Sequence, residues 1–495
     1  MRWSRPCGMA LVLCLCTAVR DARAEDYWTF NYKDFEVTTI GGSAYAVELA
    51  HHIARFDKAL SGILQLPAAY LPTKIYSLPG AQVKELLGDS DAVSYRFTGY
   101  EVMIVTNPRA DANRYWGALF GYTGSLLVSG RASRYPYWFQ LGVPALFAHT
   151  EFENDRITTG GTGHEFGRAV QGRSPIPMQT FLRLRAGDPQ LKVAAFENLY
   201  QAQSLYLARQ VYVEGKFKPE FSRYLGLIRD GTAEPNAFTA SFKISYEDLD
   251  KFIIQSMQDS VHMFVVRIPQ EPADHDLPRK LTAAQKDACL AGLSLQWNHW
   301  ADALRHASEA LESEPKNEGA LRVLARANVQ EFNFAAALAA VDRLDALAAP
   351  TAAALTDNGY VLSQLARALS EKQASVGVGA ETLIRRAKEA YDRAIALDPE
   401  DLRSWAGLAN IYGYQRDRAA AMEFVPRAAA MMEKHRDSAA LARALATMCS
   451  QTGLTDAALR FADYWRSDAL NQADLEEALA FISRLKPHPP ASNGT

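Results

Sequence analysis

The pattern of hydrophobic and polar residues changes near residue 281. Before it, short runs of aromatic and β-branched residues alternate with helical patterns. The runs 35–40 (FEVTTI), 74–78 (KIYSL) and 101–106 (EVMIVT) predict strands, because these residue types suit a pleated surface. Between the first two runs, apolar residues recur at three- and four-residue steps, so we expect a helix that begins at Ser43. The first half is therefore predicted to be α+β.

After residue 281 the chain is rich in Ala and Leu and repeats with a period of 34 residues. A small residue is followed by a second small or large residue four positions on, and by another small residue seven positions on. The positions that carry this repeat, which we interpret as structural, are Leu290, Ala303, Ala307, Ala310, Ala337, Ala387, Tyr391, Ala394, Trp405, Leu408, Tyr412, Ala421 and Ala428. They predict an all-α second half.

This spacing resembles that of tetratricopeptide (TPR) repeats. Pro315 and Pro399 follow two of the units at the position typical of the family, and Trp405 to Tyr412 match its first helix with Ala409 in place of Gly. We expect about five helix pairs between residues 282 and 485, a long connection at 371–380 and a capping helix at 472–485. A single pair cannot bury its apolar face, so the units should stack into a solenoid. The resemblance implies a protein or peptide partner on the concave face.

The first 24 residues have the pattern of a secretory signal peptide. Arg2 and Arg5 precede an apolar stretch of about 11 residues, and Ala22-Arg23-Ala24 offers a cleavage site. That stretch is shorter than the roughly 20 residues that span a bilayer. We therefore predict cleavage near Ala24 and an exported, periplasmic or secreted protein. No later stretch predicts a transmembrane segment in the mature chain.

Composition limits the function further. The chain of 495 residues has a net charge of −3. Removal of residues 1–24 takes away four Arg and one Asp, which leaves 49 basic and 55 acidic residues, a net charge of −6. We find no dense run of Lys and Arg, so the sequence predicts no nucleic-acid partner. Of five cysteines, only Cys289 and Cys449 lie outside the signal segment, and we expect both to be small buried residues.

Five segments are expected along the chain. They are the signal peptide at 1–24, an α+β domain at 25–266, a Pro- and charge-rich linker at 267–281, the repeats at 282–485 and a disordered tail at 486–495. The α+β domain contains no H-E-x-x-H, G-x-S-x-G, Walker A or G-x-G-x-x-G motif. None of the ten histidines has another histidine four residues away, so we predict no metal site and no cofactor.

One stretch of this domain carries a resemblance. Residues 135–147 (YPYWFQLGVPALF) resemble the P-x-W-x-x-E-G-x-A-x-x-F/Y helix of exported peptidase MA-like domains of the gluzincin type (DUF1570-like). In that family the preceding helix carries H-E-x-x-H. The corresponding segment here is 120–124 (FGYTG). The order of softer motifs agrees with the family, namely Pro175-Ile176-Pro177, then Tyr200, Gln203 and Ser204, with TPR units attached behind. The resemblance implies a zincin-like fold for residues 25–266.

The resemblance also implies that the catalytic chemistry is lost. Phe120 and Gly124 stand at the histidine positions, Gly121 at the general base and Leu141 at the third ligand, a Glu in the family. A zinc hydrolase needs three ligands and a base. We therefore expect no enzyme activity, no metal and no catalytic residue, and predict a pseudo-peptidase/TPR scaffold that binds a protein or peptide.

Other interpretations stay open. The FGYTG segment could be a helix that packs through two glycines, without any shared ancestry. A hydrolase could use another constellation, for example His149, Glu151 and His164. A third possibility is that the first half is only a spacer. His51 and His52 are adjacent on a helix and should diverge. We expect a set of aromatic residues to serve packing more than a cleft, namely Tyr115, Trp116, Tyr135, Tyr137, Trp138 and Phe139.

Overall fold

We describe the protein from a computed structural model. The described residues are 26–64, 72–90, 92–97, 101–108, 114–129, 135–161, 173–256, 262–269, 276–373, 375–434, 438–469 and 472–486. The predicted signal peptide, all of the predicted tail except Lys486, and His164 lie outside them. In the described part of the chain, no helix is long and apolar enough to cross a membrane.

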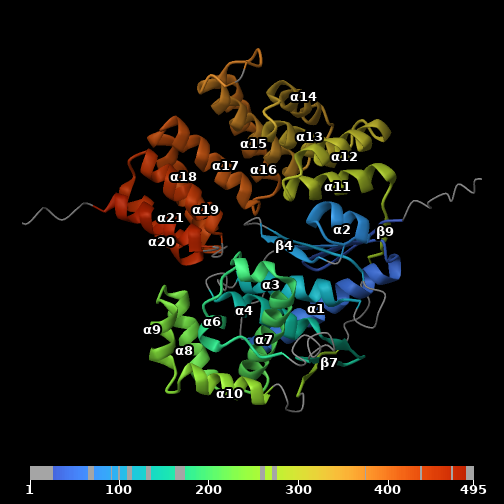
Figure 1. Ribbon diagram of the computed structural model, residues 1–495. Coiled ribbons are helices and arrows are strands. Elements are labelled where there is room, and N and C mark those ends of the chain that lie inside the picture. The colour runs from blue at the N-terminus through green and yellow to red at the C-terminus, as the bar shows by residue number, and fades with distance from the viewer. Residues whose placement is uncertain are drawn as a thin grey trace, which may run out of the picture.

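A six-stranded mixed sheet forms the centre of the first half (Figure 1). Its order is β4-β5-β3-β2-β1-β9, and β2, β3 and β5 are parallel while the other pairs are antiparallel. The strands are β1 (Trp28–Tyr32), β2 (Phe35–Thr39), β3 (Thr73–Ser77), β4 (Ser94–Phe97), β5 (Val102–Thr106) and β9 (Arg279–Lys280). The three predicted strands are confirmed to within one residue at each end.

The two faces of this sheet bury different residues, because neighbouring side chains of a strand point to opposite sides. Ile104 packs with the core beneath the sheet, whereas Met103 and Val105 pack with the core above it. The lower core is built by α1 (Ser43–Leu64), α3 (Trp116–Ser129), α4 (Tyr137–Ala148) and α7 (Ala194–Tyr212). The predicted helix that begins at Ser43 is confirmed as α1.

Smaller elements complete the first half. They are α6 (Met178–Phe181), η2 (Pro189–Lys192), α8 (Lys218–Arg229), α9 (Glu234–Ser241), α10 (Tyr246–Ser256) and a second sheet of β6 (Glu151–Phe152), β7 (Arg156–Thr159) and β8 (Phe264–Arg267). Arg55 of α1 binds this second sheet through hydrogen bonds to its backbone. Its Nη2 donates hydrogen bonds to the carbonyl oxygens of Glu153 at 2.7 Å and Ile268 at 3.2 Å. The first half is thus α+β, as predicted.

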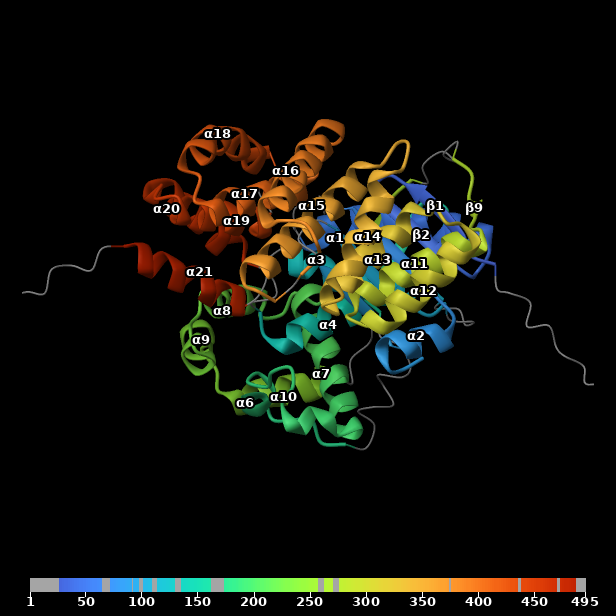
Figure 2. The same ribbon diagram turned by 90° about the horizontal axis from the view of Figure 1, so that it is seen from above.

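The second half is a helical solenoid. Its helices are α11 (Ala283–Gln296), α12 (Trp300–Ser313), α13 (Glu318–Gln330), α14 (Phe334–Asp345), α15 (Ala352–Ser370), α16 (Ala380–Leu397), α17 (Leu402–Gln415), α18 (Arg418–Lys434), α19 (Ala439–Gln451), α20 (Thr455–Asp468) and α21 (Gln472–Leu485). Figure 2 shows them in an arc from α11, beside β1 and β2, to α21. Among the described residues, ten of these helices follow one another as five packed pairs, and α21 follows the last pair.

Burial explains the 34-residue spacing. Ala303, Ala337, Ala387 and Ala421 are all 0% exposed, because they lie where paired helices cross closely. The ring of Tyr391, on α16, fills the space beside two glycines of the neighbouring first helices. A Cβ on Gly359 would lie 2.8 Å from this ring, and one on Gly407 of α17 would lie closer still. One large side chain therefore joins three helices of two successive units.

The two halves share a core above the sheet. Leu290 and Leu293 of α11, and Trp297 directly after it, pack against Tyr76 and Met103 of the sheet, together with α2 (Gly80–Leu87). Figure 1 shows α2 and α11 on the side of the sheet opposite to α1 and α3. The first solenoid helix therefore covers one face of the sheet.

Local sequence fixes the start of α11 at this junction. Thr282 caps the helix: its Oγ1 accepts a hydrogen bond from the Gln285 backbone N–H, and Gln285 Oε1 accepts one from the Thr282 N–H. Just before the cap, Arg279 and Lys280 form β9, which pairs with β1. The end of the segment that we interpreted as a linker thus belongs to the sheet. The first helix of the solenoid therefore begins directly after a strand of the first half.

We expect Leu293→Ala to lower the free energy of unfolding of the whole chain by about 2–5 kcal/mol, because the fully buried side chain fills the core between sheet and solenoid. Urea denaturation followed by circular dichroism measures this. The control Leu277→Ala, at a side chain that is 86% exposed, should change stability by less than about 0.5 kcal/mol. Equal effects of the two variants would contradict the packed junction.

Candidate functional site

The two helices singled out by the sequence lie side by side beneath the sheet. The positions in question are Phe120 on α3 and Leu141 on α4. The Phe120 ring stacks on Trp116 at a centroid distance of 4.9 Å and packs against Ala145 of α4. Leu141 is partly buried in the main core. Both side chains therefore take part in hydrophobic packing.

Gly121 and Gly124 face the sheet. A Cβ on Gly121 would lie 2.6 Å from Cγ2 of Ile104 on β5, and one on Gly124 would lie 2.5 Å from Cε1 of Tyr95 on β4. Real Cβ atoms do not approach this closely, so α3 sits on the sheet through its glycines. The interpretation of FGYTG as a helix packed through two glycines describes this contact correctly. A Glu or His side chain has no space at either position.

The other residues of the resemblance also have packing roles. Trp138 is fully buried, and Gly142 lets α4 approach the backbone of α7 at Ser204. Gln203 holds the Pro-Ile-Pro segment: its Oε1 accepts from the Ile176 N–H at 2.9 Å and its Nε2 donates to the Ile176 carbonyl at 2.8 Å. The similarity in sequence thus corresponds to contacts that maintain helix spacing.

Phenol groups surround the region between α3, α4 and α7. Burial, and then the neighbouring Tyr137, raises the pKa of Tyr95. Burial likewise raises the pKa of Tyr137 and Tyr200, whose rings stack at 5.8 Å. These hydroxyls stay neutral at physiological pH. They can donate hydrogen bonds, but none of them can act as the base of a hydrolase there.

The two adjacent histidines of α1 contact different aromatic rings. His51 lies 4.1 Å from the ring of Tyr32, whereas His52 stacks on Phe152 at 4.0 Å and meets Tyr115 edge-on. The two imidazoles thus diverge, as predicted. Burial lowers the pKa of His52 to about 4.

The aromatic residues from Tyr115 to Phe139 mainly pack, as predicted. Tyr115, Tyr122, Trp138 and Phe139 are buried, and the others are partly buried against the same core. For the alternative hydrolase, His149 lies near Trp116 and Glu151 is exposed in β6. His164 lies outside the described residues, so that constellation stays a prediction.

One group that the sequence did not indicate lies on the first helix pair. Single ligand atoms of Asp287, His306 and Glu309 lie within 4.8 Å of one another. Two basic side chains already pair with its carboxylates. Lys286 Nζ lies 3.2 Å from Asp287 Oδ1, and Arg305 lies 3.5 Å from Glu309 Oε1 and against the His306 ring. We therefore describe it as an ion-pair network that adjoins the junction through Arg305 and Glu85.

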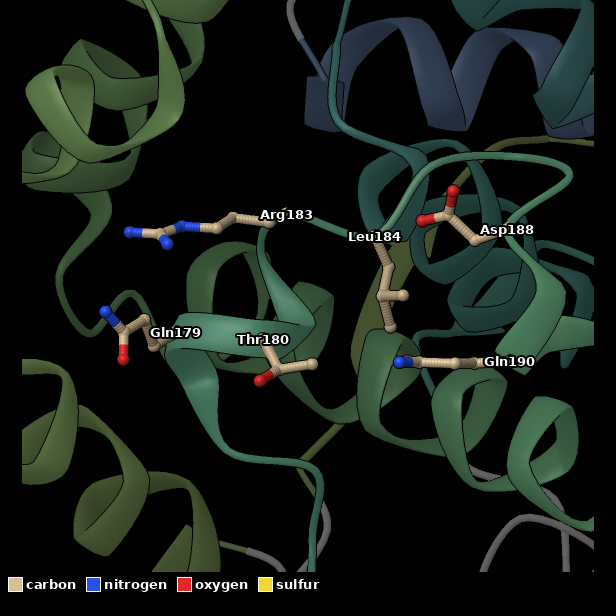
Figure 3. A pocket seen from close by; sticks show the side chains of 6 residues that line it. All are labelled: Gln179, Thr180, Arg183, Leu184, Asp188 and Gln190. Carbon is tan, nitrogen blue, oxygen red and sulfur yellow. The ribbon is translucent and has the colours of Figure 1, made fainter.

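A cavity of about 360 Å³ opens beside α6 (Figure 3). Its lining residues are Gln179, Thr180, Arg183, Leu184, Asp188 and Gln190. Figure 3 shows Gln179 and Arg183 on one side of Leu184, and Asp188 and Gln190 on the other. Arg183 is paired with Glu234 at 2.7 Å. The lining contains no histidine or cysteine, and none of it comes from α3 or α4.

A charged cluster lies on the first helices of three successive units. Arg322 Nε donates to Asp357 Oδ2 at 2.7 Å, and Arg326 Nη1 lies 3.5 Å from Asp357 Oδ1. Burial raises the pKa of Asp357, but the nearby guanidinium groups lower it by more, and the net shift is downward. On α17, Arg403 Nε donates to Asp401 at 2.9 Å. Spacing alone could not indicate this cluster, because its members on different helices are 31 to 81 residues apart.

Comparison with known proteins gives structural neighbours only. No family model and no curated protein matches the chain. It is similar to the crystal structure of a thermophilic TPR protein of Thermus thermophilus, with 21% identity, a TM-score of 0.34, and coverage of 41% of this chain and 99% of that one. It is also similar to YrrB, described as a TPR protein with an unusual peptide-binding site, with 15% identity, a TM-score of 0.28, and coverage of 40% and 92%. A third neighbour is the MamA protein, with 14% identity, a TM-score of 0.28, and coverage of 39% and 96%.

The glycine contacts of α3 lead to a stability prediction. Gly121→Ala and Gly124→Ala should each lower the free energy of unfolding by about 1–3 kcal/mol, because the added methyl group meets Ile104 or Tyr95. Gly62→Ala in α1, where a Cβ meets nothing within 4 Å, is the matched control and should leave stability equal or raise it by up to about 1 kcal/mol. If all three behave alike in urea denaturation, α3 does not rest on the sheet through these glycines.

The buried imidazole of His52 leads to a pH prediction. Its pKa falls from 6.5 to about 4 on folding, so the unfolded chain binds the proton more readily between these values. Its stabilising contribution is full above pH 6.5 and declines as the pH falls towards 4, by about 2–3 kcal/mol. His52→Phe should remove this part of the acid sensitivity, measured as unfolding free energy at pH 7 and 4.5. The surface variant His299→Gln should keep it, and identical pH profiles for both would refute the assignment.

Proposed function

We propose that the chain is an exported, non-catalytic scaffold that binds a protein or peptide on the first helices of its solenoid. The observation that supports this most is the charged surface on α13, α15 and α17. There, Arg322, Arg326 and Arg403 keep 28–33% of their side chains exposed above a buried carboxylate. Guanidinium groups so placed offer directed donors to a partner. Stacked helix pairs are also the architecture in which such an extended surface arises.

In this proposal the first half is a zincin-like pseudo-peptidase domain. Its support is that the four positions of the lost chemistry hold packing residues. Phe120 and Leu141 belong to the core, and Gly121 and Gly124 touch the sheet. Such a domain keeps its architecture without a metal centre. Its role is then mechanical, because its sheet is covered by α11 and so fixes the first unit of the solenoid.

The test uses the mature chain from Glu25 onward. Zinc content is measured by mass spectrometry, hydrolysis with casein and a peptide library, and binding with the same library immobilised. We expect no stoichiometric zinc, no turnover, and bound peptides that are lost on Tyr360→Asp in α15. Arg385→Glu on α16, a side chain that is 65% exposed, is the control on a second helix. Stoichiometric zinc together with turnover would favour the hydrolase alternative and overturn the proposal.

A further inference from the structure

The first helices of the solenoid differ in charge from their partners. Helices α13, α15, α17 and α19 together contain five Arg and two acidic residues, a net charge of +3. The second helices α14, α16, α18 and α20 contain ten basic and ten acidic residues. The whole chain has a net charge of −3. One layer of the solenoid is therefore positive in a protein that is negative overall.

The basic residues of α13 lie on one stripe. Arg322, Arg326 and Gln330 follow one another at steps of four, which places them on the same helix face. The stripe continues on α15: the guanidinium of Arg326 lies over the ring of Tyr360 at 5.7 Å, and Gln330 Nε2 donates to its hydroxyl at 3.2 Å. Aromatic and amide groups thus lie beside the charges and offer both an apolar face and hydrogen bonds.

Buried carboxylates hold these guanidinium groups in place from below. Asp357 is 4% exposed, while Arg322 and Arg326 above it are about one third exposed. Arg322 uses its Nε for Asp357, and this bond leaves both terminal nitrogens for another acceptor. Arg403 is oriented in the same way by Asp401. The three guanidinium groups are therefore held in place by two buried carboxylates, which neutralise their positive charge only in part.

We propose that this surface, formed by Arg322, Arg326, Gln330, Tyr360 and Arg403, binds an extended acidic peptide segment of a partner protein. The proposal rests on the proposed function and names the class of its partner. Carboxylates fit the planar fork of Arg in pairs of parallel hydrogen bonds. A long nucleic acid is disfavoured, because the rest of the chain carries excess negative charge and would repel a polyanion.

Fluorescence polarisation tests this with the full mature chain. The probes are a labelled twelve-residue peptide of alternating Glu and Ala, its Gln and Ala counterpart, and a single-stranded twelve-residue oligodeoxynucleotide. We expect the Glu peptide to bind at least tenfold more tightly than the Gln peptide. A rise from 50 to 300 mM salt should weaken the Glu peptide alone.

Matched variants locate the binding. Arg322→Gln with Arg326→Gln should weaken the Glu peptide at least tenfold, whereas Arg385→Gln with Arg393→Gln, the same charge change on α16, should weaken it less than twofold. Loss of Arg322 leaves Asp357 with fewer partners. A second variant is therefore Arg326→Gln alone, because the contact of Arg326 with Asp357 is the longer of the two. Arg322→Lys with Arg326→Lys should restore part of the affinity.

The outcomes separate the two proposals. If the Glu and Gln peptides bind equally and both respond to the α13 variants, the solenoid binds peptides but not by their acidity, and only this inference fails. If the oligodeoxynucleotide binds more tightly than the Glu peptide, the site accepts polyanions and the inference fails as well. If neither peptide binds and the immobilised library also binds nothing, the proposed function fails with it.

Discussion

The central sheet has to be covered on both faces, and its two covers come from different halves of the chain. Helices α1 and α3 cover one face, and α2 together with α11 covers the other. Without α11, the side chains of Tyr76, Met103 and Val105 would lose an apolar cover. Apolar surface exposed to water is the main cost that folding avoids. The first helix of the solenoid is therefore a structural part of the first half.

This constraint also explains why α3 carries glycines at positions 121 and 124. The helix lies so close to the sheet that Gly121 and Gly124 have Ile104 and Tyr95 in the space of a Cβ. Large polar residues at these positions would push the helix away from β4 and β5. A metal centre and this packing cannot share the same positions. The two glycines are what permits the close contact between helix and sheet.

Local patterns in the sequence predicted the parts of the fold that depend on neighbouring residues. The alternation in 35–40 and the 34-residue spacing of small residues were sufficient for the strands and the helix pairs, because burial follows a simple period in both cases. They were not sufficient for the junction. Leu290 has the spacing of a repeat residue, yet it packs against the sheet. Nothing local distinguishes a helix face that meets the next unit from one that meets a distant sheet.

Local sequence patterns could not predict the charged surface either. Arg322, Asp357 and Arg403 come from three different units, so only the stacking of α13, α15 and α17 brings them together. Burial lowers the pKa of Arg403, but the carboxylates of Asp401, Asp357 and Glu101 raise it by more. Glu101 immediately precedes β5 of the sheet. The first half thus adds a negative charge at this end of the surface. Because α11 holds the halves together, the distance between Glu101 and the Arg cluster is fixed by the same core that stabilises the fold.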